Sequence, residues 1–167
     1  MASNTEDMDS WDRQKEELSL SDAASFLLDE CRMVLPGIQA LLGFQLIAVF
    51  SPGFDQKLSV PDQHIHLAAI TLLAIAVALI MTPAAYNRHT GLREVTQTFI
   101  RVSTRLLLAS MLPLAVGVCL DYYLIAKVLL DGLPSALVAS GLFALFMLLW
   151  FVLPRAKGLQ RLLGRDR

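Results

Sequence analysis

The sequence predicts an all-α membrane protein with four transmembrane helices in an antiparallel bundle. The chain has 167 residues, of which 55% are hydrophobic, and its mean hydropathy is +0.55. Soluble domains are less apolar than this. An apolar helix of about twenty residues crosses a ~30 Å hydrocarbon layer, and four such segments follow one another along the chain. The predicted spans are residues 33–50, 65–86, 106–126 and 133–153.

Charges and turn residues mark the ends of these spans. Three charges in residues 29–32 precede the first span, and turn residues follow it from Ser51. A basic connector follows the second span, and residues 92–104 could extend the third helix into water. A very short turn ending at Gly132 separates the last two spans. The spans form one domain, residues 21–153.

The two ends of the chain differ in charge. Residues 1–20 are acidic and bury little apolar surface, so they are predicted to be a flexible tail or a partner-dependent helix. They lack the apolar segment of a secretory signal, and we expect no cleavage. A capping pattern at Ser19 and Asp22 predicts that the first helix begins near Ser21. Residues 154–167 form a basic tail that would attract anionic lipid headgroups. Its bases are Arg155, Lys157, Arg161, Arg165 and Arg167.

Lys and Arg are unevenly distributed between the two sides of the predicted bundle. The connector between spans two and three and the C-terminal tail together hold nine bases, whereas the two other connectors hold one each, Lys57 and Lys127. Bases beside spans favour the cytoplasmic side. The sequence therefore predicts that both termini are cytoplasmic.

One face of the first span begins with polar and small residues and ends with apolar ones. Alternating spacings of three and four place Arg32, Pro36, Gln39 and Gly43 on it. Pro36 cannot donate a backbone hydrogen bond, which favours a bend. The face is either a polar vestibule or a helix interface in which Gln39 bonds to a neighbour. The second use is the commoner one for glutamine in membranes.

The third span carries the main candidate for ion chemistry. Arg105, Pro113, Gly117 and Asp121 follow one ridge at multiples of four residues. Its ends lie ~24 Å apart, so the two charges cannot pair. Asp121 is the only acid inside a predicted span, where an ionised group costs about 2.5–3.5 kcal/mol at the bilayer centre. It is a candidate proton or cation site or, because two tyrosines follow it, an interfacial anchor.

Histidines near the outer start of the second span could join Asp121. His64 and His66 are two residues apart and point about 200° from each other on a helix, so we predict no metal site. A protonatable cluster of His66 with Asp121 is the functional interpretation, and an interfacial histidine without a role is the alternative. Cys31 and Cys119 are predicted to be buried thiols too far apart for a disulfide.

The fourth span contains small residues at four-residue spacing, which allow another helix to approach closely. That helix could belong to the same chain or to a second copy. The small residues are Ala136, Ser140 and Ala144. The full set of packing candidates is Pro36, Gly37, Gly43, Pro113, Gly117, Ala136, Ser140 and Ala144. No catalytic motif, phosphate loop or basic groove with aromatics occurs, so the sequence predicts no enzyme, no cofactor and no nucleic-acid partner.

Three segments resemble a bacterial family of small four-span membrane proteins of unknown function. They are LLDECRMVLPGIQALLGFQLIAVF, TPAAYNRH and FIRVSTRLLLASMLPLAVG. The resemblance covers Leu27 to Ile125, and its LPGxQ and PAAYxR patterns are the most specific parts. It implies the inner membrane of a bacterium, and some members are labelled sodium/proton antiporters. The matching positions, to which the family assigns no roles, are Pro36, Gly37, Gln39, Pro83, Tyr86, Arg88, Arg101 and Arg105.

Two hypotheses follow. The first is a non-enzymatic membrane module that associates with itself or with a larger complex through the fourth span and the polar face of the first. The second is a small oligomeric transporter or channel for protons or cations, in which Asp121 titrates and Arg32, Gln39 and Arg105 line a path. The sequence favours the first, because no acid lies at the middle of a span.

Overall fold

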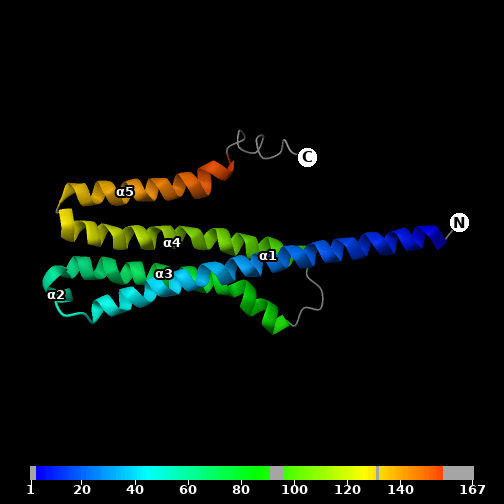
Figure 1. Ribbon diagram of the computed structural model, residues 1–167, viewed down its shortest axis with the longest axis horizontal. Coiled ribbons are helices and arrows are strands. Elements are labelled where there is room, and N and C mark those ends of the chain that lie inside the picture. The colour runs from blue at the N-terminus through cyan, green and yellow to red at the C-terminus, as the bar shows by residue number, and fades with distance from the viewer. Residues whose placement is uncertain (1–2, 91–95, 131, 156–167) are drawn as a thin grey trace. The chain divides into compact units, whose positions relative to one another are not determined.

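The computed structural model describes residues 3–90, 96–130 and 132–155, and within these ranges the fold is all-α, without a strand. The predicted fold class is confirmed (Figure 1). A π-helical turn, η1 (Leu148–Val152), and a 3-10 turn, η2 (Leu153–Arg155), follow the last α-helix. The α-helices are α1 (Ser3–Val49), α2 (Phe54–Lys57), α3 (Val60–Thr90), α4 (Gln97–Leu130) and α5 (Leu133–Met147).

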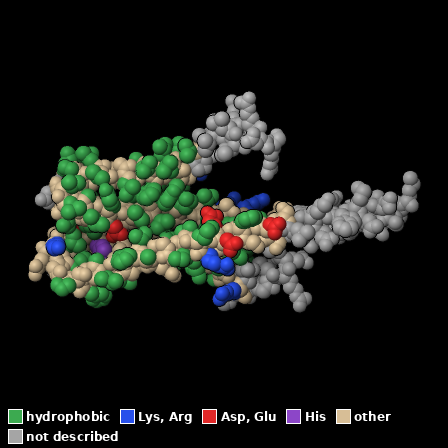
Figure 2. Space-filling model, in the orientation of Figure 1, with side chains coloured by type: hydrophobic (Ala, Val, Ile, Leu, Met, Phe, Trp, Pro, Cys, Tyr) green, Lys and Arg blue, Asp and Glu red, His purple; other side chains and the backbone are tan. Residues whose placement is uncertain are grey.

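Four helices are long and apolar enough to cross a membrane, and hydrophobic side chains cover most of the described surface in Figure 2. The chain is therefore a multi-pass membrane protein. The first three candidate spans begin before the predicted ones, because a helix continues wherever its backbone hydrogen bonds do, beyond the end of an apolar segment. The candidate spans are Ser19–Val49, Val60–Tyr86, Gln97–Leu130 and Leu133–Val152.

The start of the first helix differs from the sequence prediction. Helix α1 begins at Ser3, so the predicted start near Ser21 is wrong, and residues 3–20 are helical. Residues 13–18 are RQKEEL, and these unbranched side chains have high helix propensity. The helix propensity of residues 13–18 therefore favours a helix that continues across Ser19, where the capping pattern predicted a helix start. The predicted helix in the basic connector begins at Gln97, and residues 92–95 lie outside the described part.

The residues group into two compact units, to both of which α1, α3 and α4 contribute. The first unit comprises residues 1–40 and 77–110. Its buried apolar residues include Cys31, Ile38, Ile80 and Phe99. The ring of Tyr86 stacks on that of Phe99, with 6.0 Å between centroids. Aromatic stacking and small buried side chains thus hold the helix segments of this unit together.

The second unit comprises residues 41–76 and 111–167. Here α3 and α4 run antiparallel, as three contacts along the two helices show. Asp62 pairs with Lys127, His66 lies beside Asp121, and Leu73 lies against Gly117. The residue numbers rise along α3 as their partners' numbers fall along α4. This register decides which polar side chains of the two helices meet.

Gly117 allows a close approach between α3 and α4. A Cβ at this position would collide with Leu73 Cδ1 and lie 3.2 Å from the carbonyl oxygen of Ala69. Both of those residues are fully buried, so neither side chain has free space to move into. By contrast, a Cβ at Gly37 or Gly43 would meet no atom within 4 Å. Of the predicted packing glycines, Gly117 is the one that a described neighbour touches.

The small residues of α5 do not pack as an intrachain contact. Ala136, Ser140 and Ala144 are exposed, whereas the buried residues of α5 are Ser135 and Ala139. The intrachain alternative for this stripe is therefore wrong. The buried face also has a four-residue period, but it lies one residue earlier and thus about 100° around the helix. Pro36 is exposed and Pro113 is half-buried.

Overpacking at Gly117 tests the α3–α4 contact. We expect Gly117→Leu to lower the free energy of unfolding by about 1–3 kcal/mol, because the added side chain has no space between the helices. Gly43→Leu is the matched control and should change it by less than about 1 kcal/mol, since position 43 is open. Denaturant titration in detergent micelles, followed by circular dichroism, measures both. Equal effects of the two variants would contradict the contact.

Candidate functional site

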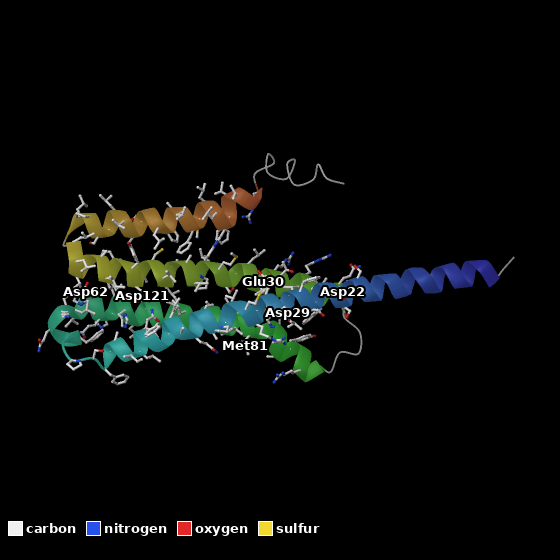
Figure 3. The ribbon with its side chains drawn as sticks, in the orientation of Figure 1. Asp22, Asp29, Glu30, Asp62, Met81 and Asp121 are labelled. Carbon is white, nitrogen blue, oxygen red and sulfur yellow. The ribbon has the colours of Figure 1, made fainter. Side chains whose placement is uncertain are left out.

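Three polar side chains from three helices meet inside the second unit. Gln45 comes from α1, His66 from α3 and Asp121 from α4. Gln45 and His66 are each only 7% exposed. Figure 3 shows Asp121 toward the same end of the unit as Asp62. Polar groups buried among apolar helices are costly unless they bond to one another, and these three do so.

The carboxylate of Asp121 contacts both of the other helices. Gln45 Nε2 donates a hydrogen bond to Asp121 Oδ2. His66 Nδ1 lies 3.4 Å from Asp121 Oδ1, and His66 Nε2 lies 3.2 Å from the backbone carbonyl oxygen of Gln45. The phenyl ring of Phe54 flanks the imidazole, with 5.5 Å between ring centroids. We call Gln45, His66 and Asp121 the polar cluster.

The contacts of His66 determine where its protons lie. A carbonyl oxygen only accepts, so Nε2 carries a hydrogen and donates it to the Gln45 carbonyl. Nδ1 then faces Asp121 Oδ1. A bare Nδ1 lone pair beside a carboxylate would be repulsive, so one proton belongs to this contact, either on the imidazole or on the carboxyl group. The His66–Asp121 pair therefore carries one proton, on the imidazole or on the carboxyl group, although no aligned hydrogen bond joins the two side chains.

The polar cluster also contains unsatisfied acceptors. Gln45 Oε1 is buried and has no hydrogen-bond partner among the described residues. Asp121 Oδ1 has no aligned hydrogen bond either, because its contact with His66 is long. Buried polar atoms in proteins are nearly always bonded to protein or to water. Two free acceptors on residues that line one cavity therefore indicate room for a donor that the described residues do not supply.

Both acceptor residues line a cavity of about 530 Å³. Its other walls are mainly apolar and come from α1, α2 and α4, with Phe44, Leu124 and Val128 among them. This volume lies within the range of small-molecule sites, about 300–1,000 Å³. The exposed residue Lys57 contributes the one lysine of the lining. The cavity therefore combines a mainly apolar lining with the polar side chains of Gln45, His66 and Asp121.

A second ionic contact lies at the same end of the antiparallel helix pair. Lys127 Nζ donates to Asp62 Oδ1 at 2.6 Å, and Asp62 is 5% exposed. Asp62 Oδ2 accepts from the Ser59 hydroxyl at 2.5 Å and from the Ser59 backbone N–H at 3.3 Å. Asp62 therefore caps the first turn of α3 while it holds the last turn of α4. This pair was not predicted from the sequence, because Lys127 was assigned to the connector between the third and fourth spans.

The other candidate path residues belong to the first unit. Arg32 is exposed and pairs with Asp29 on its own helix at 3.3 Å. Gln39 and Arg105 are also exposed. The predicted path through them stays a prediction, and the amide of the polar cluster comes from Gln45. Gln45 lies six residues after Gln39, which is about 240° around the helix. Gln45 is therefore not on the polar face that the sequence predicted around Pro36.

The predicted lipid-binding tail falls largely outside the described residues, which end at Arg155. Arg155 itself is exposed and donates from Nη1 to the Phe151 carbonyl oxygen at 2.8 Å. Lys157, Arg161, Arg165 and Arg167 are not described. Cys31 and Cys119 are both buried and free, as predicted.

Removing one partner of the Asp62–Lys127 pair tests its contribution to stability. We expect Asp62→Asn to lower the free energy of unfolding by about 1–3 kcal/mol, because the capping contacts weaken and the ion pair is lost. The matched control is Asp29→Asn, which breaks an exposed pair and should cost less than about 1 kcal/mol. Urea titration in micelles measures both variants. An Asp62→Asn protein as stable as the control would refute a structural role for the buried pair.

Comparison with known sequences adds the following. The profile of a family described as "Family of unknown function (DUF6328)" matches residues 14–154. No curated protein and no solved structure matches the chain significantly. Only the geometry of the site therefore bears on its activity.

Proposed function

The chain belongs to the DUF6328 family, whose function is unknown, and we propose that it is a non-enzymatic membrane protein that moves protons or cations. In this proposal the polar cluster takes up and releases one proton during each passage. Gln45 and His66 orient the Asp121 carboxyl group, and the Asp121–His66 contact holds the proton. The observation that carries the proposal is the arrangement of His66, with Nε2 on a carbonyl and Nδ1 on a carboxylate.

The surroundings of the polar cluster support proton exchange. A buried acid in a membrane span is costly and is commonly found where protons or ions pass. The cavity beside Asp121 gives solvent or solute a place next to the shared proton. Four spans enclose little space, so a complete path would run between copies, and we propose a homo-oligomer or a subunit of a larger membrane complex.

We also propose the inner membrane of a bacterium as the location, with both termini cytoplasmic and anionic lipids at that face. The distribution of Lys and Arg between connectors supports this orientation. It places the polar cluster toward the outer face, because Asp62 and His66 lie in the first turns of α3, which follow the outer connector.

Flux in proteoliposomes tests the proposal. Purified protein should dissipate an imposed pH gradient at least ten times faster than empty vesicles, with a cation gradient altering the rate if movement is coupled. Asp121→Asn should abolish the excess rate, because an amide cannot exchange the proton. Glu30→Gln is the matched control, since Glu30 is an exposed acid on α1, and it should leave the rate unchanged. Each variant is first checked for wild-type mass and helical content. Flux equal to that of empty vesicles, or retained in Asp121→Asn, would overturn the proposal.

A second candidate function is that of a self-associating module or accessory subunit. The exposed stripe of Ala136, Ser140 and Ala144 on α5 favours it, because small residues on a lipid-facing helix allow a second helix to approach. We expect native mass measurements in mild detergent to show an oligomer that Ser140→Leu dissociates. Val138→Leu, an exposed position about 200° around the same helix from Ser140, is the control and should leave the mass unchanged. Monomers throughout, with no co-purifying partner, would refute this function.

A further inference from the structure

The acceptors of the polar cluster suggest what kind of molecule the cavity takes. Gln45 Oε1 and Asp121 Oδ1 are buried, lack hydrogen bonds among the described residues, and belong to residues that line the same cavity. A buried carbonyl left without a donor destabilises the folded protein. A ligand that offers donors at this point would relieve that destabilisation. Both free atoms are acceptors, so the ligand needs at least two N–H or O–H groups on one head.

The charge of the site favours an ammonium head. Asp121 provides a carboxylate, and its second oxygen is already held by Gln45 Nε2. A hydrogen bond between an ammonium and a carboxylate is about twice as strong as a neutral one. A primary or secondary ammonium group has the two N–H donors that Gln45 Oε1 and Asp121 Oδ1 lack. A quaternary ammonium group has the charge but no N–H, so it cannot satisfy either acceptor.

The apolar lining of the cavity indicates that the ligand is apolar beyond its ammonium group. Phe44, Leu124 and Val128 are among the apolar residues of the lining, which encloses about 530 Å³. The ligand thus buries a hydrocarbon or aromatic portion against α1 and α4. Among the side chains that the structure describes, the titratable and charged groups of the lining are His66 on α3, Asp121 on α4 and Lys57 on α2, while Lys127 is held by Asp62. Because Lys57 would repel a second cationic group, the ligand carries a single positive charge.

We infer that the cavity binds a lipophilic monocation with a primary or secondary ammonium head, which displaces the proton shared by His66 and Asp121. The inference rests on the proposed function, because it uses the same proton. In the exchange, the R–NH₃⁺ head takes its place on the Asp121 carboxylate and one proton leaves the His66–Asp121 pair for water. No covalent bond to carbon forms or breaks. Amine binding and proton binding are therefore competitive at one carboxylate.

Binding of dansylcadaverine, a fluorescent primary amine with an aromatic body, tests the inference with the full-length protein in micelles. We expect saturable binding that weakens as pH falls, with about one proton released per amine in weakly buffered solution. Asp121→Asn and Gln45→Met should each weaken binding at least ten-fold. Gln39→Met is the matched control, because Gln39 is an exposed glutamine on the same helix, and it should bind like the wild type. N-acetylated dansylcadaverine, which is neutral, should bind at least ten-fold more weakly.

The outcomes separate this inference from the proposed function. Equal binding of the acetylated and free amines, or binding unchanged in both Asp121→Asn and Gln45→Met, would show that the cavity is only an apolar slot for lipid chains and would overturn the inference. No amine binding together with Asp121-dependent proton flux would overturn the inference and leave the proposed function standing. Amine binding with proton release but no flux in liposomes would overturn transport and support the site.

Discussion

The antiparallel register of α3 against α4 is the constraint on which the rest of the second unit depends. Gly117 has no Cβ, and the helices therefore approach closely at Leu73. The Asp62–Lys127 pair holds the other end of the contact. A shift of one residue would rotate each α3 side chain by about 100° relative to α4. His66 and Asp121 would then point apart, so the packing of one glycine and one ion pair sets the geometry of the polar cluster.

The energetics of the polar cluster argue against a purely structural role. Hydrogen bonds between membrane helices contribute on average about 0.6 kcal/mol each. An ionised acid at the bilayer centre costs about 2.5–3.5 kcal/mol, and less toward the interface. Asp121 lies toward one end of its span, where this cost is smaller, but Gln45 Oε1 and Asp121 Oδ1 remain without hydrogen bonds among the described residues. An apolar side chain in place of Asp121 would hold these helices together at least as well. This balance is why we assign the polar cluster to proton exchange.

The sequence predicted the fold more fully than the site, for physical reasons. Membrane spans depend on long apolar segments, which composition records directly, so the number and order of the spans could be predicted. The proximity of His66 and Asp121 could also be anticipated, because His66 follows the start of one span and Asp121 precedes the end of the next, on the same predicted side of the membrane. The role of Gln45 could not, since it depends on how α1 is rotated about its axis. The polar face predicted for α1 contains Pro36 and Gln39, and Gln45 lies about 240° around the helix from Gln39.

The start of α1 shows a different limit. Residues 3–20 are acidic and poor in apolar side chains, so burial alone predicted no ordered structure, yet they continue the helix. Local propensity and attachment to an existing helix remove the nucleation cost that an isolated segment would bear. The capping pattern at Ser19 does not start a helix, because residues 3–18 are already helical and the helix continues through Ser19.

The pairing of charges between α3 and α4 explains how Asp121 stays available. The two helices bring together two acids and two bases within a short distance along the register. Lys127 pairs with Asp62, whose other oxygen caps α3 through Ser59. Had Lys127 paired with Asp121 instead, a permanent cation would have neutralised that carboxylate and removed any need for a proton. Because Asp62 holds the lysine, the basic side chain beside Asp121 is the imidazole of His66. The Asp62–Lys127 ion pair thus leaves Asp121 and His66 to each other on the same two helices, as the proposed proton exchange requires.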